Sequence, residues 1–157
     1  LSFIEIVVGY VGAAATKSFS IGLVILATSY LFVQIDITHP IFMLFFLLIT
    51  CVTFSLLGFI IGIISDNFEQ LNIVPMLIIT PLVFLGGSFY TINMLPPFWQ
   101  NIALLNPAVY LISGFRWAFF GIGDVPIITS LLTILSFTSL CMFIIWRIFK
   151  TGYKIKT

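Results

Sequence analysis

The sequence predicts an all-α membrane protein. We expect one transmembrane domain over residues 1–157, a polytopic helix bundle with four spans and an extracellular re-entrant helical segment between spans three and four. The first observation is composition: 61% of the residues are hydrophobic, 7% are charged, and the mean hydropathy is +1.27. Soluble domains carry about 25% charged residues, so this chain cannot build a soluble surface. The other two observations are long stretches without charge and an apolar segment broken by prolines and amides.

The uncharged stretches locate the spans. A spanning helix needs about 20 apolar residues, and charged side chains mark where a span cannot continue cheaply. The gaps predict spans over residues 18–35, 40–65, 71–90 and 125–146, with a cytoplasmic lead-in over 1–17 and a cytoplasmic tail over 147–157. Pro40 and Pro126 fit helix starts, where the missing N–H costs nothing. Pro75 and Pro81 are expected to kink the third span.

The segment over residues 91–124 is apolar but cannot form an ordinary span. Its prolines remove backbone donors, and hydrocarbon does not solvate its amides. Irregular backbone at membrane depth persists only where protein or water covers it. We therefore interpret the segment as an outer re-entrant excursion that caps or lines a pathway. Its helix-breaking and amide residues are Asn93, Pro96, Pro97, Gln100, Asn101, Asn106 and Pro107.

The positions of lysine and arginine set the predicted topology. Four of the six cluster after the last span, which makes the C-terminal tail cytoplasmic. With four spans the N-terminal end is also cytoplasmic, so five of these six side chains lie inside and only Arg116 lies outside. If residues 91–115 crossed the membrane, the split would be four to two, which favours the four-span interpretation.

Several residues of the outer segment have a structural interpretation. Tyr90, Trp99, Tyr110 and Trp117 are expected at headgroup level, where aromatic rings with a polar tip are favoured. Arg116 is predicted to pair with Asp124. The alternative for Arg116 is an anionic lipid group.

Two patterns lie near the cytoplasmic half. Ser2 and Glu5 have the spacing of a capping box, which predicts a helix start. This helix is either a lead-in to the first span or a surface that another protein pushes on. Gly58 and Gly62 form a GxxxG pattern, which predicts close helix packing within or between chains.

Catalytic and metal-binding signatures are missing from the sequence. It contains no phosphate-binding loop, no H-E-x-x-H and no G-x-S-x-G, and His39 is its only histidine. A net charge of +1 argues against nucleic acid as a partner. We predict no catalytic, cofactor-binding or metal-binding residue in this chain, so energy for uphill transport must come from elsewhere.

The sequence strongly resembles the C-terminal half of ABC-2 type transport permeases, the membrane subunits of ATP-binding cassette exporters. The residues that carry the resemblance are Gly86-Gly87, Met94-Leu95-Pro96-Pro97, Trp99, Asn106-Pro107 and Gly114-Phe115-Arg116. The opening SFIEIVVGYVGAAATKS is similar to the segment that leaves the family's coupling loop, and the ending RIFKTGYKIKT is similar to its basic tail.

The resemblance implies a role and a set of partners. This chain would hold the last four of six spans, in agreement with the absence of an initial Met, and would lie in a bacterial inner membrane. Two permeases, as a homodimer or a mixed pair, would sit among membrane lipids on ATPase subunits that bind ATP and Mg²⁺. Ser2, Glu5, Val8 and Tyr10 would belong to the coupling region, and Pro96, Pro97, Trp99, Asn106, Pro107 and Arg116 to the outer gate.

The expected function is therefore the permease subunit of an ATP-driven exporter for a drug, lipid or glycan. A secondary carrier or channel is the alternative, and a membrane enzyme acting on lipid is a third hypothesis. A carrier predicts ionisable residues at mid-membrane or an internal repeat, and the sequence shows neither. Asp36 and His39 alone are too few for an enzyme site.

Overall fold

The computed structural model describes residues 3–152, and the regular elements within this range are helices. Four are long and apolar enough to cross a membrane: α1 (Phe3–Phe32), α2 (Pro40–Ile64), α3 (Phe68–Leu85) and α6 (Ile127–Thr151). Three short elements lie between α3 and α6, namely η1 (Ile92–Met94), α4 (Pro97–Ala103) and α5 (Pro107–Phe120). The predicted all-α fold with four candidate spans is confirmed.

The helix ends differ in places from the predicted span limits. α1 continues through Lys17 as one helix of 30 residues, because lysine is a good helix former and its long stem can carry the ammonium to the interface. The predicted boundary between the lead-in and the first span therefore lies inside α1. Residues 33–35 of that predicted span lie beyond the end of the helix. α3 ends at Leu85 rather than 90, where Gly86-Gly87 turns the chain. α6 extends past 146 to Thr151.

Prolines mark several helix starts as expected. Pro40 is the first residue of α2, and Pro126 immediately precedes α6. Pro97 and Pro107, predicted only as helix breakers, also open helices, α4 and α5. Pro75 and Pro81 lie inside α3, which remains one assigned helix, so the kink stays a prediction.

α2 is the centre of the bundle and packs against α1, α3, α5 and α6. One core cluster joins Val7 and Val11 of α1 to Leu56 and Ile60 of α2 and to α6. A second cluster joins Phe46 of α2 to α5 and α6. Between them the hydroxyls of Thr53 and Thr138 lie 2.9 Å apart, so a polar contact also ties α2 to α6.

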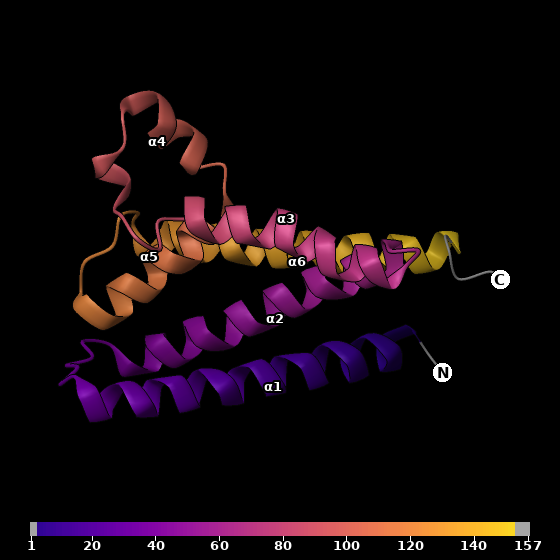
Figure 1. Ribbon diagram of the computed structural model, residues 1–157, viewed down its shortest axis with the longest axis horizontal. Coiled ribbons are helices and arrows are strands. Elements are labelled where there is room, and N and C mark those ends of the chain that lie inside the picture. The colour runs from indigo at the N-terminus through magenta and orange to yellow at the C-terminus, as the bar shows by residue number, and fades with distance from the viewer. Residues whose placement is uncertain (1–2, 153–157) are drawn as a thin grey trace.

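The two ends of the bundle differ in construction. The first residues of α1 and the last residues of α6 lie at one end, and α4 and α5 lie at the other (Figure 1). α3 ends and α6 begins at that second end, an arrangement that the re-entrant prediction requires. α4 and α5 meet at 94°, so they are either a broken span or a re-entrant pair. α3 has no buried residue among those described, which leaves it the least covered of the long helices.

Candidate functional site

The turn after α3 brings the outer segment back onto the bundle. Gly87 has a φ of 87°, a left-handed conformation that favours glycine. A Cβ on Gly86 would lie 2.8 Å from the Leu82 carbonyl oxygen and 3.0 Å from the Cβ of Ala108. Only a residue without a side chain lets the end of α3 approach α5 this closely.

Arg116 joins three parts of the outer segment. Its Nη1 donates to the Asp124 carboxylate in the loop between α5 and α6, and its Nη2 donates to the carbonyl oxygens of Gly87 at 2.7 Å and Tyr90 at 3.2 Å. The side chains of Arg116 and Asp124 are only 21% and 8% exposed. The predicted pairing with Asp124 is confirmed, and Arg116 also accounts for two backbone acceptors of the turn after α3.

Asn106 connects the beginning of α5 to the end of α3. Its Oδ1 accepts from the Ala108 N–H at 2.9 Å and so caps α5, as asparagine commonly does. Its Nδ2 donates to the Leu82 carbonyl oxygen at 2.7 Å. That oxygen needs a partner because the Gly86 N–H binds Val83 instead. The side-chain amide of Asn106 therefore hydrogen-bonds to a backbone group at the beginning of α5 and to another near the end of α3.

Of the remaining predicted gate residues, Pro107 begins α5, and Pro96, Pro97 and Trp99 lie on α4 and its entry. Pro96 is the N-cap of α4, and Gln100 donates to the Leu95 carbonyl oxygen at 2.8 Å. Trp99 is 53% exposed and packs edge-on against Phe98. The structure thus brings Asn106 and Arg116 together through the turn after α3, while Pro96, Pro97 and Trp99 stand apart on α4.

A second loop is attached to the outer segment, and sequence reasoning missed it. The N–H groups of Thr38 and His39 donate to the carbonyl oxygens of Phe119 and Ala118, at the C-terminal end of α5. The His39 ring stacks on Trp117 with 4.2 Å between centroids. No local spacing could reveal these contacts, because about 80 residues separate the partners. The Trp117 ring contacts both His39 and Phe42, and its predicted place at headgroup level stays a prediction.

The predicted coupling residues lie at the opposite end, at the beginning of α1. Val7 is buried against the core, whereas Glu5 lies exposed, as do Val8 and Tyr10 at 64% and 69%. Tyr10 lies 6.0 Å from the Phe59 ring of α2. Ser2 falls outside the described residues, so the capping box stays a prediction.

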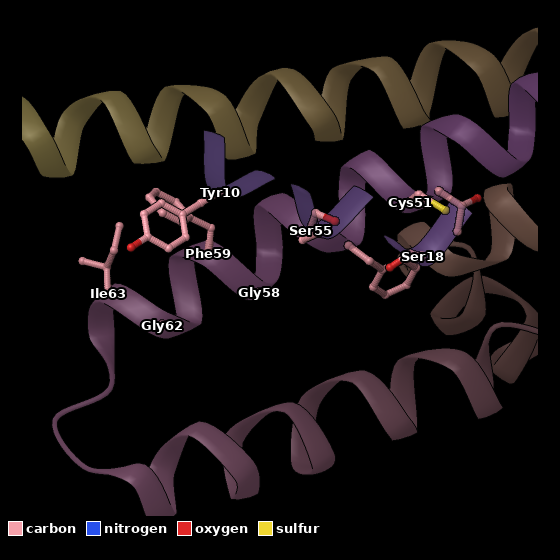
Figure 2. Close-up of a pocket in the computed structure, with 11 residues that line it drawn as sticks. Tyr10, Ser18, Cys51, Ser55, Gly58, Phe59, Gly62 and Ile63 are labelled. Atoms are coloured by element: carbon pink, nitrogen blue, oxygen red, sulfur yellow. The ribbon is translucent and has the colours of Figure 1, made fainter. Parts of the chain in front are cut away.

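A groove between α1 and α2 begins beside Tyr10. It has a volume of about 830 Å³ and runs along Ser18, Ser55, Gly58 and Gly62 (Figure 2). A Cβ on Gly58 or Gly62 would meet no atom within 4 Å, so no described helix packs on these glycines. Gly58 and Gly62 therefore do not pack against another helix within the described residues. Packing of these glycines against a second chain stays a prediction. Cys51, on the same groove, is buried and not disulfide-bonded.

The described residues contain no group of three histidine, cysteine or acidic side chains that could hold a metal ion. The arrangement is one of helix caps, a buried ion pair and apolar grooves. Helix caps and a buried ion pair hold helices in place.

The chain is similar in sequence to known transport proteins. The sequence model of the ABC-2 type transporter family matches residues 1–120. The inner membrane transport permease YadH of Escherichia coli strain K12 is 38% identical over 152 residues, which cover 97% of this chain and 59% of the relative. Nodulation protein J of Neorhizobium galegae is 28% identical over 145 residues, 92% of this chain and 53% of the relative.

The chain spans 59% of the length of the YadH permeases, including that of Shigella flexneri. No solved structure matches the chain. The four candidate spans and the inner-membrane relatives support a multi-pass protein of a bacterial inner membrane. With most of its length matched by the family's sequence model, the chain belongs to the ABC-2 type transporter family.

Proposed function

We propose that the chain is the membrane subunit of an ATP-driven exporter and that it forms part of the path for a drug, lipid or glycan. The observation that carries this proposal is its membership of the ABC-2 type transporter family. The relatives named transport permease support a transmembrane transport role. ATP and Mg²⁺ would bind a separate ATPase subunit, because the 157 residues contain no phosphate-binding loop.

In this proposal the two ends of the bundle have different tasks. The exposed residues Glu5, Val8 and Tyr10 near the beginning of α1 would receive motion from the ATPase. Charged and apolar side chains at one helix end offer a partner both ionic and apolar contacts. The outer segment, held by Arg116 and Asn106, would close the far end of the path. Two copies of the permease, or two related permeases, would form the full transporter.

The first experiment tests the energy source. The protein is purified with a candidate ABC ATPase subunit and reconstituted in lipid vesicles. We expect ATP hydrolysis, and ATP-dependent loss of substrate from the donor compartment, only when both subunits are present. Transport that persists in vesicles without any ATPase would overturn the proposal and favour a secondary carrier or a channel.

The second experiment tests the coupling residues. Glu5→Lys and Val8→Trp should leave membrane insertion intact and reduce transport per ATP hydrolysed several-fold. Val24→Trp is the matched control, because Val24 lies on the same helix and is 63% exposed against 64% for Val8. Equal transport ratios for Val8→Trp and Val24→Trp would remove these residues from coupling.

A further inference from the structure

A second cavity lies between α3 and α4, and Asn106 lines it. It has a volume of about 350 Å³. The last two turns of α3 form one wall, which includes Ile78, Leu82 and Leu85. The opposite wall includes Ile102 of α4 and Leu105, which follows α4. Figure 1 shows α4 standing away from the long helices at this end of the bundle.

The inner surface of this cavity offers almost nothing to a polar ligand. No charged side chain lines it. The Tyr90 hydroxyl donates to the Leu85 carbonyl oxygen at 2.9 Å, and the Asn106 amide donates to the Leu82 carbonyl oxygen at 2.7 Å. Both polar side chains are thus already committed to the end of α3. A ligand that enters must be apolar over most of its length, since burying an unpaired polar group is costly.

Trp99 supplies the one polar feature at the edge. It lines the cavity, is 53% exposed, and its indole N–H has no acceptor among the described residues. Tryptophan favours the boundary between hydrocarbon and headgroups, where one side of the ring is apolar and the N–H finds an acceptor. An apolar cavity with one donor at its mouth matches an acyl chain that ends in an ester carbonyl.

The surroundings of this cavity favour lipid as its occupant. Lipid is the solvent of this helix bundle, and a void beside α3 would lose the dispersion contacts of its lining. About 350 Å³ lies within the size range of small-molecule sites, about 300–1,000 Å³.

We propose that the cavity between α3 and α4 binds one acyl chain of a bilayer phospholipid, with the Trp99 N–H donating to its ester carbonyl. The bound chain fills the space that separates the outer segment from α3. This inference concerns a resident lipid and does not depend on ATP-driven export.

Photo-crosslinking tests the proposal. The protein is reconstituted in vesicles that contain phosphatidylcholine with a diazirine in one acyl chain, irradiated and mapped by mass spectrometry. We expect adducts on Leu82 and Ile102 at several-fold higher yield than on Met76 and Leu77, which are exposed on α3 but do not line the cavity. Equal yields at both sets would show ordinary surface lipid and overturn the proposal.

Two variants sharpen the result. Ile78→Trp fills the cavity from an exposed position and should lower the yield at Ile102 several-fold, whereas Leu77→Trp, one residue earlier on α3, should not. Leu105→Trp, at a site 84% exposed, replaces Ile78→Trp if that variant does not fold. Cross-links from the cavity to a second protein copy in place of lipid would assign the cavity to a protein interface and overturn the proposal.

Discussion

Arg116 is the residue on which the outer segment depends most. Its guanidinium pairs with Asp124 and serves two carbonyl oxygens of the turn after α3. Arg116→Ala leaves a nearly buried carboxylate and two acceptors without their donor, and breaking such a pair costs about 3 kcal/mol or more. We expect a loss of that size in the free energy of unfolding, measured by denaturant titration in detergent micelles.

Arg147→Ala is the control for Arg116→Ala. Arg147 is exposed near the end of α6, so removing it changes the same net charge without breaking a buried pair. We expect a change within about 0.5 kcal/mol. Similar losses for the two variants would contradict a structural role for the contacts of Arg116.

Substitutions can test the two side-chain hydrogen bonds of Asn106 one at a time. Asn106→Ser keeps an oxygen that can cap α5 but cannot reach Leu82, and leaving this partly buried carbonyl without its donor should cost about 1 kcal/mol. Asn106→Ala removes the cap as well, so it should lose about 1 kcal/mol more. Thermal unfolding of both variants, beside Asn101→Ala at an exposed site, measures the difference. Equal stability of the serine and alanine variants would show that the cap contributes nothing.

At the scale of elements, the crossing of α2 and α5 depends on Gly114. A Cβ there would lie 2.1 Å from Cε1 of Phe46, which is fully buried and has no free direction in which to move. Gly114→Ala should therefore destabilise the protein by about 1–3 kcal/mol, as overpacking does. Differential scanning fluorimetry in detergent measures the shift.

Two other glycines complete this comparison. Gly12→Ala and Gly58→Ala meet no atom within 4 Å, so each should gain up to about 1 kcal/mol from better helix propensity. A gain at Gly12 with a loss at Gly58 would show that another helix packs in the groove beside Gly58, as the GxxxG pattern predicts. A gain at Gly114 would contradict the close approach of α2 and α5.

The sequence predicted elements well where local rules decide them. Charge gaps found the long helices, and Pro40 and Pro126 marked two helix starts. It did not predict that α1 passes through Lys17, because the tolerance of a helix for one lysine depends on where the ammonium can reach. The contact of His39 with Trp117 and the double role of Asn106 also escaped, because both depend on tertiary packing between distant residues.

At the scale of the whole molecule, topology is the property to test. Single cysteines replace Asn93, Ile122 and Asn67 after Cys51→Ala and Cys141→Ala remove the natural thiols. If α4 and α5 re-enter rather than cross, a maleimide that cannot pass the membrane should label Asn93→Cys and Ile122→Cys from outside and leave Asn67→Cys unlabelled. Labelling of the first two from opposite sides would instead make α4 and α5 one broken span.

The unbroken length of α1 has a mechanical consequence. At 1.5 Å per residue its 30 residues form a rod about 45 Å long, against a hydrocarbon thickness of about 30 Å. No proline interrupts it, and the loop that follows holds the last carbonyl groups of α5. A displacement of α1 near Glu5 would therefore be transmitted along the helix to that loop. The size of the displacement at the loop would depend on the point in the bilayer about which α1 tilts.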